Sequence, residues 1–310
     1  MKSSSNSLNT GMFLPVIALL WAATFWGMVW YPLRLLESAG LNGLWTTWVI
    51  FSTAALTGLW FVWSKRAELW QQPGLLLLIA LANGWLNTGF VLAVLDGNVV
   101  RVLLLFYLSP LWSTLLGWWW LGEKPSRFSM ATLGLAMVGA MFMLWNPDLG
   151  FPWPQGKADW MAITAGMGFS FSNVAMRHLK HLSAPLKAAA TWWGVVIMVG
   201  VWLLLTQAPW PQISAGAWIG AVVLGGVGIF SATLAVVYGV QKMPVHRSAT
   251  ILLFELVAGA LSAQLLTNEV VMWVEWFGGS LIMLAAYLSA RNAARDAARD
   301  ATRDIGKAQS

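Results

Sequence analysis

Apolar residues occur along this chain in long runs that short polar segments separate. We predict a membrane-spanning helix for each run, because a helix that crosses the hydrocarbon core needs about 20 mainly apolar residues. Glycine and proline mark many of the breaks between the runs. The ten predicted spans are residues 12–33, 42–63, 74–95, 101–122, 128–145, 158–179, 186–206, 215–239, 247–267 and 271–290.

The pattern occurs twice, with five runs in each half, at a step of 146 residues. This step aligns Arg101 with Arg247 and Glu123 with Glu269. The charged pairs carry most of the weight, since apolar matches are frequent in so apolar a chain. Repeats with an odd number of spans lie inverted in the membrane, and inverted repeats build secondary transporters.

We therefore predict an all-α membrane protein of ten transmembrane helices, arranged as two five-helix inverted repeats. The expected divisions are a first repeat over 1–145, a connecting loop over 146–156, a second repeat over 157–290 and a cytoplasmic tail over 291–310. The tail carries repeated Ala-Ala-Arg-Asp-like units without a hydrophobic stripe. We expect it to be a solvated segment that anchors the topology, with binding of a regulatory partner as the alternative.

Composition and charge agree with a membrane location. Only 10% of the residues are charged and 58% are hydrophobic, whereas a soluble domain carries about 25% charged residues. When the loops are assigned alternately to two sides, every lysine and arginine except Arg34, Arg101 and Lys157 falls on one side. Positively charged loops stay in the cytoplasm, so we predict a multi-pass protein of the cell inner membrane with both termini cytoplasmic. The net charge of +6 follows this topology, and we expect no nucleic-acid partner.

Candidate reactive groups are few. The chain has no cysteine, and its three histidines, His178, His181 and His246, lie at predicted span ends beside basic residues. We therefore expect no metal site and no cofactor. Neither a nucleophile constellation nor a phosphate-binding glycine loop is present in the sequence, so we predict that the protein is not an enzyme and does not use ATP.

Tryptophan is abundant, with 23 residues. Most of them fall near predicted span ends, where an indole ring places its apolar body in lipid and its N–H in contact with water. Trp21, Trp26, Trp85 and Trp112 fall within spans. Each of these four is expected to need a polar partner or a cavity.

Glu255 is an acidic residue deep in a predicted span. It lies about eight positions from the start of the span, roughly 12 Å along a helix that rises 1.5 Å per residue. An ionised carboxylate at this depth costs about 2.5–3.5 kcal/mol on insertion scales, so the side chain is expected to face the bundle interior. Two interpretations stay open. Glu255 either contacts a substrate ammonium or carries a coupling proton, or it forms a helix–helix hydrogen bond as a protonated carboxyl.

Two other spans place polar groups at depth. Asn83 and Asn87 are four residues apart and share a helix face, where they either join two helices or present their amides to a solute. Pro110 cannot donate to the carbonyl of Phe106, which loosens the helix and makes Pro110 a candidate hinge. Polar groups within the membrane are tolerated where they line a cavity, and we expect that role for Tyr107.

The first and sixth spans, which are equivalent in the repeat, offer a candidate apolar clamp. Trp21 aligns with Met167, and the residues four positions later, Phe25 and Phe171, also align. We expect Trp21, Met167 and Phe171 to enclose the apolar part of a flat solute. Ordinary helix packing is the alternative.

Several of these features resemble the EamA branch of the drug/metabolite transporter superfamily. Ten spans in two repeats and cytoplasmic termini are typical of that branch. A mid-helix proline such as Pro110, followed near the end of the span by Gly122 and Glu123, is similar to its repeat signature. In the second copy Leu256 and Asn268 stand where proline and glycine are expected, which puts equal movement of the two halves in doubt.

Within this branch the chain is most similar to YddG-type aromatic amino-acid exporters, at Trp21 and Tyr107. The resemblance covers residues 12–290 and implies a cavity between the repeats. Spans 1, 3, 4, 6, 8 and 9 would line that cavity, and spans 5 and 10 would pack outside it.

We therefore predict a secondary transporter that exports small amphipathic metabolites, preferably aromatic amino acids, by alternating access. Its expected partners are a small-molecule substrate and the lipid bilayer, and one chain is expected to suffice because both repeats are present. Proton coupling through Glu255 is a candidate, although one carboxylate without a partner base favours uncoupled transport. The alternative substrates are a cationic drug or another metabolite, and the alternative classes, a membrane-embedded enzyme or a channel, are disfavoured. The predicted substrate-binding residues are Trp21, Asn83, Asn87, Tyr107, Met167, Phe171 and Glu255.

Overall fold

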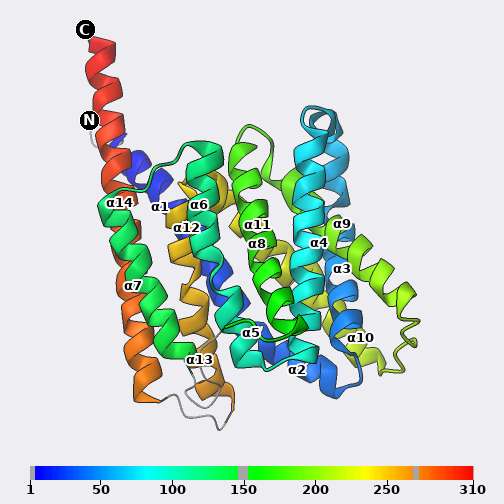
Figure 1. Cartoon of the computed structure of the whole chain (residues 1–310). Helices are drawn as coiled ribbons and strands as arrows, with labels where there is room; N and C mark the ends of the chain where they lie inside the picture. Colours follow the sequence, from blue (N-terminus) through cyan, green and yellow to red (C-terminus); the bar gives the residue numbers. More distant parts are fainter. Residues whose placement is uncertain (1–3, 146–152, 268–271, 310) are drawn as a thin grey trace.

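The computed structural model describes residues 4–145, 153–267 and 272–309, and the regular elements within these ranges are helical (Figure 1). Most of the predicted connector 146–156, together with Asn268 and Glu269, lies outside the described residues. The helices are α1 (Ser4–Met28), α2 (Trp30–Ser38), α3 (Gly43–Ser64), η1 (Arg66–Trp70), α4 (Pro73–Asp96), α5 (Val99–Phe106), α6 (Ser109–Leu121), α7 (Arg127–Leu144), α8 (Lys157–His178), α9 (Ala184–Leu205), α10 (Ala215–Val223), η3 (Leu224–Ile229), α11 (Phe230–Lys242), α12 (Val245–Leu252), α13 (Phe254–Leu266) and α14 (Trp273–Gln309).

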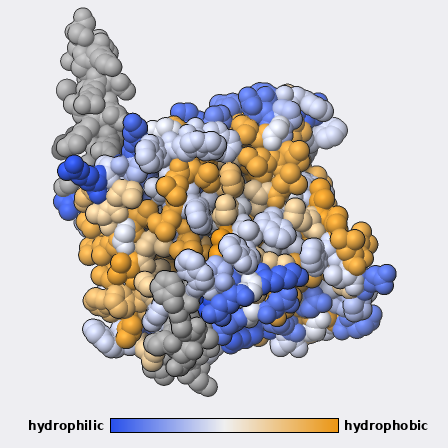
Figure 2. Space-filling view, viewed as in Figure 1, coloured by the Kyte–Doolittle hydropathy of each residue, from blue (hydrophilic) through white to orange (hydrophobic). Residues whose placement is uncertain are grey.

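The prediction of an all-helical membrane protein is confirmed. Eight stretches of the described chain are long and apolar enough to cross a membrane, and α8 and the first part of α14 run beside them in the same bundle (Figure 1). Helix α8 tolerates Asp159 and Arg177 because neighbouring helices surround most of it. Figure 2 shows hydrophobic residues across the middle of the front face and more hydrophilic residues towards its two ends.

The first and last described residues lie at the same end of the bundle (Figure 1). We call it the terminal end and the other the opposite end. Helix α14 continues without a break to Gln309, so the predicted tail is the part of this helix that projects from the bundle. Helices α7 and α14 pack together at one edge, with Gly139 and Gly278 letting the two backbones approach, which is where the resemblance placed spans 5 and 10.

We divide the other helices into two lobes, which share an extensive interface where α3 packs on α9 and a smaller one where α12 packs on α6. Lobe A contains α4, α5, α6, α8 and α9, and lobe B contains α1, α2, α3, the α10–η3–α11 span, α12 and α13. Each lobe combines helices from both repeats, since α8 and α9 join α4 to α6, while α1 to α3 join α10 to α13. Along α3 and α9, Gly58 lies against the ring of Trp192 and Gly200 against Trp48. The lobes also meet where α11 packs on α8 and α9.

The single step of 146 residues does not hold throughout. It relates the starts of α5 and α12, Val99 and Val245, but α3 and α9 start at Gly43 and Ala184, which are 141 positions apart. The eighth span accounts for four of the five positions that separate the two steps, because it has 28 residues where the third has 24. This span contains the π-helical segment η3, and such a segment accommodates an additional residue per turn.

The fourth and ninth spans are each interrupted at equivalent places. Helix α5 ends at Phe106 and α6 begins at Ser109, while α12 ends at Leu252 and α13 begins at Phe254. Pro110 explains the first break, because it provides no amide hydrogen for the helix. The second break occurs although Leu256 stands where the repeat predicts a proline. Both repeats therefore contain the helix break, with or without the proline.

Candidate functional site

The two helix breaks bring together one predicted site residue from each repeat. Tyr107 occupies the break between α5 and α6, and Glu255 lies in the first turn of α13, directly after the other break. Tyr107 packs against the cluster that contains Leu253 and Leu256, the neighbours of Glu255, and its hydroxyl interacts electrostatically with the Glu255 carboxyl group. A carboxylate near a helix N-terminus also interacts favourably with the helix dipole. Tyr107 and the helix N-terminus are therefore two polar groups that face the carboxyl group of Glu255.

Both side chains combine an interior position with access to solvent. Protein atoms desolvate the carboxylate of Glu255 and the hydroxyl of Tyr107, yet both residues are only partly buried by accessible surface. An ionisable group held inside a membrane domain is a candidate for contact with substrate or ions. The pair joins α5–α6 of lobe A to α13 of lobe B.

Three aromatic side chains extend from Tyr107 in a chain of edge contacts. The ring of Phe106 lies 5.5 Å from that of Tyr107, 5.0 Å from Phe90 and 6.1 Å from Phe169, each near a T-shaped arrangement. All four rings are partly buried. They come from α4, α5 and α8, and such rings offer faces and edges to a flat apolar group.

Sequence reasoning missed Phe90, Phe106 and Phe169 although signals for them were present. Phe106 is adjacent to Tyr107. Phe169 lies two residues from both Met167 and Phe171, and two residues rotate a helix by about 200°. The predicted clamp therefore selected one face of α8, whereas the face towards the aromatic chain is the opposite one.

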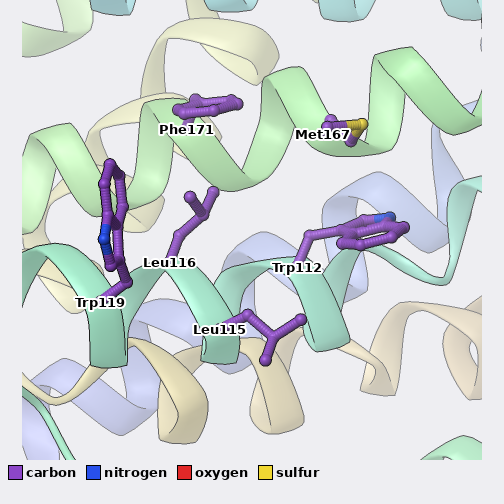
Figure 3. Close-up of a pocket in the computed structure, with 6 residues that line it drawn as sticks. All are labelled: Trp112, Leu115, Leu116, Trp119, Met167 and Phe171. Carbon is purple, nitrogen blue, oxygen red and sulfur yellow. The ribbon is translucent and has the colours of Figure 1, made fainter.

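Met167 and Phe171 line a shallow apolar groove between α6 and α8 (Figure 3). Helices α6 and α8 pack against each other and stand next to each other in Figure 1. Leu115 and Trp119 are 52% and 80% exposed. The six lining residues are Trp112, Leu115, Leu116, Trp119, Met167 and Phe171.

Trp21 is not among the residues that line this groove. It lies on α1 in lobe B and is 52% exposed. The structure therefore places Trp21 in lobe B and the pair of Met167 and Phe171 in lobe A, and a clamp of all three stays a prediction. Met167 and Phe171 share a surface, as their spacing predicted.

The side-chain amides of Asn83 and Asn87 donate hydrogen bonds to groups on the helices α4 and α8. The amide of Asn83 donates to the hydroxyl of Ser172 on α8 and to the carbonyl of Ile79. The amide of Asn87 donates to the carbonyl of Asn83, 3.0 Å away. Of the two interpretations offered for this pair, the geometry favours a helix–helix contact for Asn83, while Asn87 is partly buried and stays a candidate for solute binding.

The Pro110 break is held against α8 by small residues. The carbonyl of Phe106 faces Gly166, where a side chain would collide with it. The hydroxyl of Ser170 donates to the carbonyl of Ser109 at 2.8 Å. The freed polar backbone is therefore buried in protein, as irregular backbone in a membrane must be.

Ion pairs join the fourth and sixth spans at both ends. At the opposite end Arg101 Nε lies 2.8 Å from Asp159 Oδ2, and at the terminal end Arg177 Nε lies 2.8 Å from Glu123 Oε1. The order of charges is reversed, with the cation on the fourth span at one end and on the sixth at the other. The two spans of lobe A are thereby held in register along their length.

The tryptophans at span ends and those within spans have different surroundings. Trp60, Trp63 and Trp70 at span ends are 77%, 69% and 83% exposed, as expected of a membrane-interface belt. Within the spans, Trp85 donates to Thr164 Oγ1 at 3.1 Å.

A bundle of two repeats with paired helix breaks is the architecture of a membrane transporter, and comparison with known proteins identifies the family. The EamA-like transporter family matches residues 13–145 and 156–291, which is most of the chain and both repeats. The protein therefore belongs to the EamA-like transporter family and is a multi-pass membrane transporter, not an enzyme.

Two individual proteins add to this picture. The chain is 24% identical over 142 residues to the uncharacterized transporter PA0485 of Pseudomonas aeruginosa, and the match spans 44% of this chain and 44% of that relative. A crystal structure that is 18% identical has a TM-score of 0.72 and covers 91% of this chain and 98% of the other. At this identity the likeness shows the fold alone.

Proposed function

We propose that this transporter exports small amphipathic solutes that carry an ammonium group, with aromatic amino acids as the preferred class. The observation that carries the proposal is the Tyr107–Glu255 pair at the two helix breaks. A carboxylate in a desolvated setting attracts a cation more strongly than it would in water. The ammonium of the solute would contact Glu255.

The apolar part of the solute would lie against the aromatic chain of Phe90, Phe106 and Phe169. These rings lie on the lobe A side of Tyr107, so a solute held between them and Glu255 would contact both lobes. Asn87 would supply an amide to the polar end. Because both lobes contribute to one site near the midplane, rocking of the lobes around it would give alternating access.

Uncoupled transport, driven by the solute gradient, is the simplest energetic scheme for a site with one carboxylate. The protein is proposed to act as a monomer in the inner membrane with both termini cytoplasmic. A cationic drug is the second candidate substrate, favoured by the same carboxylate and rings. It differs in lacking a carboxylate, so it would not need the amide of Asn87.

Uptake of radiolabelled tryptophan into proteoliposomes tests the proposal. We expect saturable uptake that unlabelled phenylalanine competes with, and a loss of at least tenfold in kcat/KM for Glu255→Gln, since a charged contact is replaced by a neutral one. Asn87→Ala should weaken amino-acid uptake and leave uptake of a permanent aromatic cation unchanged.

The matched control is Glu275→Gln, which replaces a carboxylate at the start of α14 that accepts a hydrogen bond from the backbone N–H of Met272. It should transport at the normal rate. Absence of saturable uptake of any aromatic amino acid by folded protein would refute the substrate class. A rise in uptake on applying a pH gradient, lost in Glu255→Gln, would replace uncoupled transport with proton coupling.

A further inference from the structure

The polar contacts at the terminal end connect the two lobes in a way that the substrate site does not explain. Glu123 lies two residues after the end of α6, and its carboxylate accepts a hydrogen bond of 3.0 Å from the backbone N–H of Val245, the first residue of α12. Arg177 at the end of α8 donates through Nη1 to the carbonyl of Gln241 on α11, at 2.7 Å. Lys187 on α9 donates to the side-chain carbonyl of Gln241. Three side chains of lobe A therefore bond to lobe B within this one cluster.

Each of the three charged groups also has a partner within its own lobe. Glu123 and Arg177 form an ion pair in which both side chains are 18% exposed. Lys187 is fully buried and donates to the carbonyls of Leu179 at 2.9 Å and Met176 at 3.4 Å. These carbonyls lie at the end of α8, where a cation is favourable.

This arrangement makes the contact between the lobes reversible. If the lobes part, lobe A keeps its charges paired or capped, and lobe B loses only neutral partners, the amide of Gln241, one backbone carbonyl and one backbone N–H. Water can satisfy these neutral groups. Breaking a buried ion pair would instead leave an uncompensated charge at a high energetic cost.

The ion pair at the opposite end has a different connection. Arg101 and Asp159 both belong to lobe A, and Asp159 also accepts from the backbone of Gln155 just before α8. Parting the lobes at that end leaves this pair intact. The two ends of lobe A thus have similar internal ion pairs, but the pair at the terminal end is continued into lobe B.

We propose that Glu123, Arg177 and Lys187, with Gln241 and the N-terminus of α12, form the gate that closes the terminal end of the transport path. Opening at this end releases Gln241 and Val245 while the Glu123–Arg177 pair persists. The inference rests on the alternating access of the proposed function and is independent of the substrate.

The absence of cysteine from the chain allows a direct test with one introduced thiol. Phe169→Cys places a reporter on the interior face of α8. In proteoliposomes sorted by orientation with a C-terminal tag, a membrane-impermeant maleimide is added on the tagged side. Arg177→Ala and Gln241→Ala, each combined with the reporter, should increase the labelling rate about tenfold, because each removes one charge-assisted bond that favours closure.

A charge exchange separates a gate from a merely structural ion pair. The double variant Glu123→Arg with Arg177→Glu restores the pair inside lobe A but can neither accept from Val245 N–H nor donate to Gln241. We expect its labelling to stay as fast as that of Arg177→Ala. The control Asp159→Asn, at the opposite end, should label from the tagged side at the unchanged rate.

Two outcomes would overturn the gate. Unchanged labelling in Gln241→Ala, which keeps every charge and is the mildest variant, would do so, as would slow labelling restored by the charge exchange. Size-exclusion profiles and thermal unfolding in detergent establish that each variant is folded. The assay needs no solute, so a failed gate leaves the substrate proposal standing and failed uptake leaves the gate standing.

Discussion

The replacement of Gly194 by alanine tests the reasoning about helix packing most directly. Gly194 on α9 faces Ala80 on α4, and a Cβ at this position would lie 2.6 Å from the Cα of Ala80 and closer still to its carbonyl oxygen. These atoms belong to a helix backbone, so no side chain can rotate away. Gly84, one turn along α4, meets the carbonyl of Gly194 in the same way. The two helices must therefore separate or shift.

The size of the effect follows from two opposing terms. Overpacking of this kind costs about 1–3 kcal/mol, while alanine stabilises a helix interior by about 0.5–1 kcal/mol relative to glycine. We expect a net loss of about 1–2 kcal/mol, or roughly 2–6 °C in Tm for a chain of this size. Thermal unfolding in detergent, followed by tryptophan fluorescence, measures it.

Gly134 on α7 provides the matched control. It lies within a helix, and a Cβ there meets nothing within 4 Å. Gly134→Ala should therefore show only the stabilisation of the helix by alanine, which raises Tm by about 1–3 °C. If Gly194→Ala raised Tm by as much as Gly134→Ala, close backbone packing of α4 on α9 would be refuted.

Three further predictions concern the site and its supports. Tyr107→Phe keeps the ring and removes the hydroxyl that interacts with Glu255, and we expect kcat/KM for tryptophan uptake to fall about tenfold; an unchanged value would show that the hydroxyl plays no part. Phe171→Ala, on the outer groove, should leave KM for uptake within twofold of the original, and a tenfold rise would return Phe171 to the binding site. Asp159→Ala leaves Arg101 buried without its carboxylate and should lower Tm by several degrees, whereas exchanging the two charges should restore most of the loss; equal Tm values for all three proteins would contradict a structural pair.

Much of the fold follows from the sequence because the membrane leaves few alternatives. Apolar runs of about 20 residues must form helices that satisfy their own backbone, so the number and order of spans could be predicted. The repeat could be recognised for the same reason, and Pro110 marked a break by its missing amide hydrogen. Glu255 could be assigned to the interior because a carboxylate facing lipid is too costly.

The positions of the side chains around the axis of each helix could not be assigned in this way. Met167, Phe169 and Phe171 are all apolar, and lipid and protein interior both accept apolar groups, so composition does not distinguish the outer face of α8 from the inner one. The break at Leu253 has no proline to indicate it, and the helices on both sides of it, α12 and α13, pack against α1.

The sequence alone therefore determined the class of protein, the two repeats and the residues whose burial is costly. Tertiary structure decided which of those residues meet. Tyr107 and Glu255 are 148 positions apart in the chain, and only the packing of lobe A on lobe B places hydroxyl against carboxylate. Glu123 was visible as part of a repeat signature, but its bonds to Arg177 and Val245 depend on where three helices end in space. Contacts between distant segments are set by shape and close packing, which local hydropathy does not encode.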